Sequence, residues 1–93
     1  MSEVIAALSA VIADRKNCPR EGSYTCELLA RGKTEILKKV GEEAVEVVVA
    51  GALEGKERLI YETADLVYHL LVMLASEDLT WSEIEAELGR RFR

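Results

Sequence analysis

The sequence predicts an all-α protein of about five helices, folded as a single domain over residues 1–93. Residues that favour helices, chiefly Ala, Leu, Glu, Lys and Arg, are abundant, whereas one Pro and six Gly leave little material for tight turns. Apolar residues also recur at helical spacing along the chain. Because 49% of the residues are apolar and only 5% are aromatic, the core is expected to be aliphatic.

The first expected helix begins after Ser2, whose side chain can cap it, and runs to about Lys16. Pro19 and Gly22 mark the loop that follows this helix. One stripe of the helix is apolar and is expected to face the core: Val4, Ile5, Leu8, Val11 and Ile12.

A short helix is expected through the segment CELLAR, capped by Ser23 or Thr25 and ended by Gly32. A longer helix then runs from about Thr34 to about Leu53. Its second half contains VEVVVA, whose β-branched residues could also form a strand. We favour the helix, because the preceding TEILKKVGEEA consists mostly of good helix formers, no turn separates the two segments, and no second segment could pair with such a strand.

Two further helices complete the expected fold. Gly55 interrupts the chain, and KERLIYETADLVYHLLVMLASE is expected to be helical to about Glu77. Thr80 and Glu83 then have the spacing of a capping box, which opens a last helix that runs to about Arg91.

The overall charge and the cysteines exclude some classes of protein. The net charge is −5, with 17 acidic against 12 basic residues, which argues against binding to a nucleic-acid backbone. The two cysteines, Cys18 and Cys26, lack the spacing of a zinc site. The longest uninterrupted apolar run is too short to span a bilayer, and no secretory segment is recognisable. We therefore expect a cytoplasmic protein that binds neither nucleic acid nor membrane.

The helix after Thr34 carries three acids, Glu42, Glu43 and Glu46, within an arc of about 100°. Beyond Glu46 this helix is apolar around its whole circumference, so we expect it to be surrounded by protein. Carboxylates that enter a buried region need a partner, because burying an unpaired charge is costly.

The next long helix has a matching stripe of Glu62, Asp65 and His69 within an arc of about 60°. Consecutive helices joined by a short link normally pack antiparallel, so up to five carboxylates could converge. Such a group would repel itself without a cation. Several carboxylate oxygens suit Mg²⁺ or Mn²⁺ rather than zinc, and the sequence therefore predicts a divalent-metal site.

A simpler interpretation of each stripe stays open. The acids Glu42 and Glu43 could pair with Lys38 and Lys39, one turn earlier on the same face. On the other helix, Asp65 and His69 could hydrogen-bond to each other. Two matching stripes on adjacent apolar helices nevertheless favour the metal interpretation.

The chain also resembles a known family. The run SYTCELLARGKTEILKKVGEEAVEVVVA, followed by YETADLVYHLLVML, is similar to phosphoribosyl-ATP pyrophosphohydrolases of histidine biosynthesis. The acidic pair E-E-x-x-E and E-x-x-D is similar to the wider all-α nucleotide pyrophosphohydrolase superfamily that includes MazG. The resemblance implies hydrolysis of 1-(5-phosphoribosyl)-ATP to 1-(5-phosphoribosyl)-AMP and pyrophosphate, the second step of the pathway, with Mg²⁺.

The resemblance also implies roles for residues and partners. It makes Glu43, Glu46, Glu62 and Asp65 the metal ligands, with Glu42 as a further ligand or the base that activates water, so that the candidate catalytic acids are Glu42, Glu43 and Glu46. It implies a homodimer with four-helix bundles across its interface, and the apolar helices support this independently. Besides the nucleotide substrate, the next histidine-pathway enzyme is a candidate partner.

The substrate's phosphates need cations besides the metal, and the candidates are Lys38, Lys39, Lys33 and Arg15. The first two are the best placed, although pairing with the neighbouring acids is an equal alternative. Tyr24 lies where a loop could close over the substrate, or it packs as an ordinary ring. His69 completes the candidate substrate-binding set.

Two rival functions remain at the level of sequence. A related pyrophosphohydrolase acting on an ordinary NTP or on dUTP would have the same acidic residues. A non-enzymatic helical dimerisation module would carry the acids merely as solvated charges. Turnover of the different nucleotides would test the first, and the response to Mg²⁺ or Mn²⁺ would test the second.

Overall fold

The computed structural model describes residues 2–92, and they form five α-helices and one short π-helix, with no strand among them. This confirms the all-α fold and shows that the strand alternative for VEVVVA is wrong. In chain order the elements are α1 (Glu3–Asn17), α2 (Tyr24–Arg31), α3 (Lys33–Val49), η1 (Ala50–Glu54), α4 (Lys56–Ser76) and α5 (Trp81–Arg91).

The helix ends follow the capping signals of the sequence. The Ser2 side chain accepts a hydrogen bond from the Ile5 N–H at the start of α1. At α2, Ser23 is the cap, whereas Thr25 lies inside the helix. The expected capping box of α5 is present. Gly32 separates α2 from α3 with a φ of 90°, a conformation that favours glycine.

The expected long helix differs from the structure at its end. Its α-helical part stops at Val49, and η1 is a π-helix, a wider turn with longer-range hydrogen bonds. Here the returning helix comes close, since a Cβ at Gly51 would lie 3.5 Å from Leu59 Cδ1. Gly55, with a φ of 89°, then reverses the chain.

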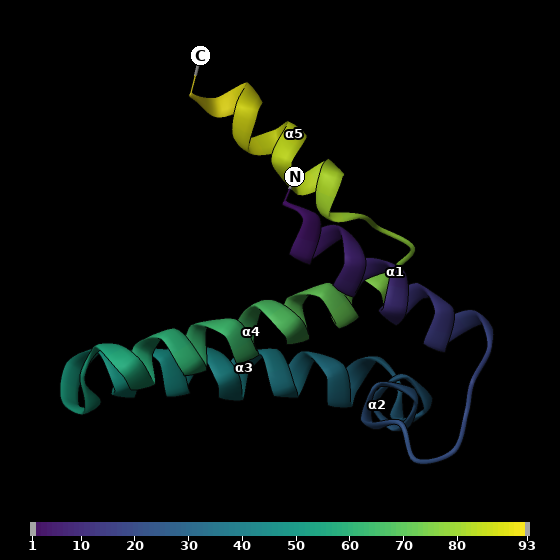
Figure 1. Ribbon diagram of the computed structural model, residues 1–93, viewed down its shortest axis with the longest axis horizontal. Helices are drawn as coiled ribbons and strands as arrows, with labels where there is room; N and C mark the ends of the chain where they lie inside the picture. The colour runs from purple at the N-terminus through teal and green to yellow at the C-terminus, as the bar shows by residue number, and fades with distance from the viewer. Residues whose placement is uncertain (1, 93) are drawn as a thin grey trace.

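Helices α3 and α4 lie side by side and antiparallel, and they form the longest part of the molecule (Figure 1). Helices α1 and α2 pack at one end of this pair, and α5 extends away from it (Figure 1). The core lies at that same end, where four helices meet. Its buried residues are Ile12, Leu28, Ile36, Leu71, Val72 and Leu74.

Among residues 2–92, no comparable core covers the other end of the pair. Val45, Val48 and Leu53 are 60%, 69% and 82% exposed, and Ile60 and Tyr61 on α4 are also exposed. One chain alone therefore leaves the valine-rich half of this helix exposed, and the expectation that protein surrounds it rests on the predicted partner copy. The reason is that the buried contacts of α1 and α2 with the pair lie at its opposite end. The four-helix bundle across a dimer stays a prediction.

Helix α4 is the one helix in residues 2–92 that is long and apolar enough to cross a membrane, by length and composition alone. The core helix of a soluble protein passes the same test. In this fold α4 packs against α1, α2 and α3 and buries Glu62 and His69. Within the described structure 28% of its apolar stretch is buried.

Because the core lies at one end of the helix pair, two adjacent residues of α1 should contribute differently to stability. Ile12 is 1% exposed and Val11 is 45% exposed. We expect Ile12→Ala to lower the free energy of unfolding by about 2–5 kcal/mol, because it leaves a cavity in the core. The matched variant Val11→Ala should cost less than about 1 kcal/mol. Urea unfolding checks both values, and equal losses would contradict the placement of the core.

Candidate metal centre

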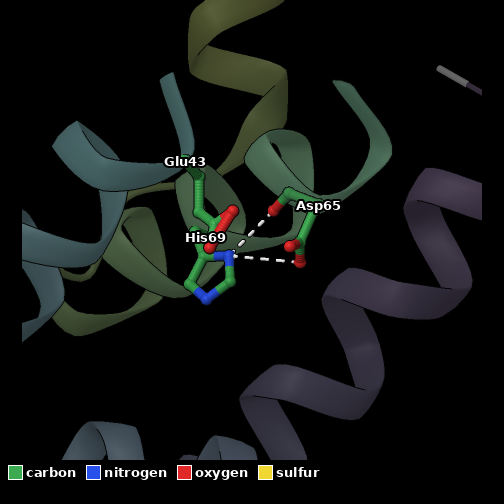
Figure 2. A group of neighbouring side chains, drawn as sticks. All are labelled: Glu43, Asp65 and His69. Carbon is green, nitrogen blue, oxygen red and sulfur yellow. Dashed lines mark hydrogen bonds and ion pairs between the residues drawn. The ribbon is translucent and has the colours of Figure 1, made fainter. Parts of the chain in front are cut away.

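Glu43, Asp65 and His69 form a compact group between the two long helices (Figure 2). One potential ligand atom from each residue lies within 4.8 Å of the other two. Glu43 comes from α3, and the other two lie one turn apart on α4. Because the helices are packed side by side, one member of the first acidic stripe, Glu43, meets Asp65 and His69 of the second.

The burial of this group is unusual for charged residues. Glu43 is 8% exposed and His69 is 3% exposed, whereas the Asp65 side chain keeps 37% of its surface in solvent. The group thus has a buried side and an open side. A solute can reach it past the Asp65 carboxylate.

The Glu43 carboxyl group is the electrostatic centre of the site. Burial raises its pKa, and a hydrogen bond with Asp65 and the charge of that residue raise it further. Lys39 opposes this effect, with its Nζ 3.5 Å from Glu43 Oε1. Two carboxylates so close together need a shared proton or a cation between them.

The Lys39 ammonium group belongs to the same electrostatic system. Burial opposes its charge, but Tyr24, Glu43 and Glu42 outweigh that effect and raise the pKa of Lys39. Its Nζ also lies 3.8 Å from Glu42 Oε1. The pairing of this lysine with the neighbouring acids is therefore confirmed. Lys38 is exposed, and within residues 2–92 it forms no ion pair.

His69 is held through both of its ring nitrogens. Nδ1 lies 2.8 Å from the main-chain oxygen of Asp65 and 3.6 Å from its Oδ1 (Figure 2). Nε2 lies 3.2 Å from the Tyr24 hydroxyl group. The predicted contact between His69 and Asp65 is present, whereas the contact with Tyr24, 45 positions away in sequence, had no signal in the sequence pattern.

The remaining predicted acids lie outside the compact group. Glu62 is buried and its Oε1 lies 3.4 Å from Arg58 Nη2, an i, i+4 partner that the spacing could have indicated. Glu42 and Glu46 are exposed. The structure of one chain thus brings together Glu43 and Asp65 from the candidate metal ligands.

Two of the predicted phosphate-binding residues lie elsewhere. Arg15 and Lys33 line a separate cavity of about 490 Å³ and pair with Asp14 at 2.8 Å and Glu77 at 3.3 Å. Lys33 is ten positions before Glu43, or roughly 15 Å along the helix. Within one chain, neither cation reaches the acidic group.

The chemistry of the donor set fits a hard divalent cation. Two carboxylates supply oxygen ligands, and burial together with the neighbouring Asp65 raises the pKa of Glu43, so a bound cation would favour its charged form. Glu43 and Asp65 would hold the ion. The antiparallel helix pair therefore defines an all-α protein with a candidate carboxylate metal centre.

Comparison with known proteins agrees with this class. The family model for phosphoribosyl-ATP pyrophosphohydrolase matches residues 5–92. A phosphoribosyl-ATP pyrophosphatase of Metallosphaera sedula is 53% identical over the whole of both chains. Those of Limosilactobacillus fermentum and Sulfurisphaera tokodaii are 52% and 49% identical, over 94% and 99% of this chain and 82% and 98% of their own. The chain belongs to the phosphoribosyl-ATP pyrophosphohydrolase family, and it is a hydrolase.

The raised pKa of Glu43 makes a prediction about stability. A carboxyl group whose pKa is raised by folding stabilises the folded state below its unfolded pKa, and this contribution is lost as pH rises through the folded pKa. At neutral pH without metal, Glu43→Gln should therefore raise the melting temperature, by roughly 4–8 °C for each 1 kcal/mol recovered. Mg²⁺ should stabilise the wild-type protein and have little effect on this variant.

The exposed neighbour provides the control for this experiment. Glu42→Gln changes the same charge one residue away, where the side chain is 51% exposed. It should leave the melting temperature within about 2 °C of wild type and keep most of the response to Mg²⁺. Thermal melts with and without Mg²⁺ check both variants. If the two variants show the same melting temperatures and the same response to Mg²⁺, Glu43 is not the central residue of the metal site.

Proposed function

We propose that this protein hydrolyses 1-(5-phosphoribosyl)-ATP to 1-(5-phosphoribosyl)-AMP and pyrophosphate, the second step of histidine biosynthesis. We propose Mg²⁺ as the cofactor, with Mn²⁺ as a substitute. The observation that carries the proposal is the pairing of the buried Glu43 with the partly exposed Asp65, in a chain 53% identical to a phosphoribosyl-ATP pyrophosphatase over its full length. Two neighbouring acids, one of them open to solvent, suit a metal-assisted attack on a phosphoanhydride.

Different residues of the chain would have different roles in this reaction. A bound divalent ion would stabilise the charge that develops on the phosphate oxygens. Glu43 and Asp65 would hold it, with Glu46 and Glu62 as further ligands from the neighbouring turns of the same helices. A carboxylate beside the ion accepts the proton of the attacking water, and Glu42 is the candidate outside the ligand set.

A cation of the protein should contact the polyanionic substrate. Lys39 is the best placed, because its side chain is 26% exposed and lies against the acidic group. Once a metal ion neutralises the acids, the Lys39 ammonium group would leave the Glu43 carboxylate and contact a substrate phosphate instead. Lys38, Arg15 and Lys33 are less well placed within one chain.

We further propose that the protein acts as a cytoplasmic homodimer, without nucleic acid or membrane. The exposed apolar residues at the free end of α3 and α4 support this, because no other segment of residues 2–92 covers them. A second copy packed against that end would complete a four-helix bundle from two helix pairs. Contact with the next histidine-pathway enzyme remains a candidate interaction.

The direct test of the function is release of pyrophosphate from phosphoribosyl-ATP. We expect turnover with Mg²⁺ and at least about a hundredfold loss after chelation, because metal charge on the leaving group is removed. ATP and dUTP, supplied at equal concentration, should be poorer substrates. Faster turnover of either nucleotide would favour the rival pyrophosphohydrolase function, and no turnover of any nucleotide would favour the dimerisation module.

The two adjacent lysines separate phosphate binding from simple ion pairing. Lys39→Met should lower kcat/KM by about ten- to a hundredfold, equivalent to roughly 1.5–3 kcal/mol, if it contacts a phosphate. The matched variant Lys38→Met should stay within about threefold of wild type. Kinetics at saturating Mg²⁺ measure both values. The phosphate-binding role is excluded if Lys39→Met also stays within threefold.

The exposed end of the helix pair makes a prediction about assembly. Sedimentation at micromolar concentration should show a dimer, and Val48→Glu should weaken it, because a charge would enter an apolar interface. Leu79→Glu, at another partly exposed apolar position beyond α4, is the control and should leave the dimer intact. A stable folded monomer of the wild-type chain would contradict the proposed assembly.

A further inference from the structure

Tyr24 makes a contact that none of the proposed metal or phosphate roles uses. It is the first residue of α2, and its hydroxyl group lies 3.2 Å from Nε2 of the buried His69 on α4. The next residue, Thr25, forms a hydroxyl–hydroxyl hydrogen bond with Tyr68, which precedes His69. Two adjacent residues of α2 are thus bonded to two adjacent residues of α4, and only one of these bonds leads to the acidic group.

The positions of the protons in this chain of bonds follow from chemistry. A main-chain carbonyl oxygen can only accept, so Nδ1 of His69, at 2.8 Å from the Asp65 oxygen, carries the proton. In the neutral ring Nε2 is then an acceptor, and the Tyr24 O–H group donates to it. Both ring nitrogens are therefore occupied. His69 can bind a metal ion only if one of these bonds breaks.

The arrangement also has a consequence for Asp65. The Nδ1–H group lies beside the Asp65 carboxylate, with 3.6 Å between Nδ1 and Oδ1. The Nδ1–H group is thus directed at the Asp65 carboxylate as well as at the Asp65 main-chain oxygen. The Asp65 main-chain oxygen is already the normal acceptor of the His69 backbone N–H in the helix, so it is shared. The hydrogen bond from the Tyr24 hydroxyl group to Nε2 therefore helps to determine which ring nitrogen carries the proton.

We propose that Tyr24 is a positioning residue of the metal centre: its O–H group holds His69 with the proton on Nδ1, directed at Asp65, and so keeps His69 from becoming a metal ligand. The contribution to catalysis rests on the proposed function, but the state of the imidazole ring does not. Outer hydrogen bonds of this kind commonly tune metal sites, at about 10–100-fold in affinity or activity.

The structure offers a matched control for this role. Tyr24→Phe and Tyr68→Phe each remove one hydroxyl group from the same α2–α4 contact. The Tyr68 ring packs edge-on against the His69 ring at 5.0 Å, and the Phe variant keeps that packing. A merely structural contribution to holding α2 would therefore be similar in the two variants, whereas the effect on His69 would differ.

The test uses nuclear magnetic resonance, which is simple here because the chain contains one histidine. Long-range ¹H–¹⁵N spectra at about pH 8 identify the protonated ring nitrogen of a neutral imidazole. In metal-free wild-type protein and after addition of Mg²⁺, we expect the proton on Nδ1. Tyr24→Phe should show a population protonated on Nε2, and Tyr68→Phe should match wild type.

Kinetics provide the second measurement. Tyr24→Phe should raise the Mg²⁺ concentration that gives half-maximal activity by about tenfold. In Tyr68→Phe this concentration should stay within about threefold of the wild-type value. The proposal is overturned if wild-type His69 is protonated on Nε2, if Mg²⁺ removes the Nδ1 proton, or if the two variants have the same tautomer populations. If no form of the protein hydrolyses phosphoribosyl-ATP, the proposed function fails, and the spectra still decide the role of Tyr24.

Discussion

The contact between the Glu43 and Asp65 carboxyl groups is the interaction on which the functional part of this structure depends. The packing of α3 against α4 brings an oxygen of each group within 4.8 Å of the other, and burial then raises the pKa of Glu43. A fold selected for stability alone would avoid such a pair, since each buried charge loses hydration. Lys39 offsets the repulsion in part, and a divalent cation would offset the remainder.

The α3–α4 pair belongs to the buried core at one end, whereas its other end exposes apolar side chains. Residues of α1 and α2 cover the pair where α3 begins and α4 ends, and there the core is closed. Toward η1 the same helices expose valine, leucine and isoleucine side chains. Glu43 and Asp65 lie in the middle parts of α3 and α4, between these two regions. A partner at the open end would therefore add apolar contacts without disturbing the closed core.

Much of the fold could be predicted from local signals. Ser2, Ser23 and the Thr80–Glu83 box mark helix starts, because a capping side chain acts within a few residues. The π-helix at η1 has no signal in the local sequence pattern. The exposure of the valines also depends on which helices reach which end of the pair.

The candidate site was predictable to a similar degree. Spacing along each helix identified both acidic stripes, but it could not say that Glu43 is buried while its neighbour Glu42 is exposed. That difference depends on how α3 is rotated against α4. The Tyr24–His69 contact joins positions distant in sequence, so no local pattern could indicate it. The distant positions of Arg15 and Lys33 likewise follow from tertiary packing.

The central claim is that carboxylates from two different helices act on one divalent ion. Equilibrium titration with Mn²⁺, followed by its electron spin resonance signal, tests this on wild type, Glu43→Gln, Asp65→Asn and the double variant. If both residues hold the same ion, each single variant should lose at least about tenfold in affinity, about 1.4 kcal/mol. The double variant should then lose clearly less than the sum of the two losses. Additive losses, or Mn²⁺ binding unchanged in either single variant, would contradict the account.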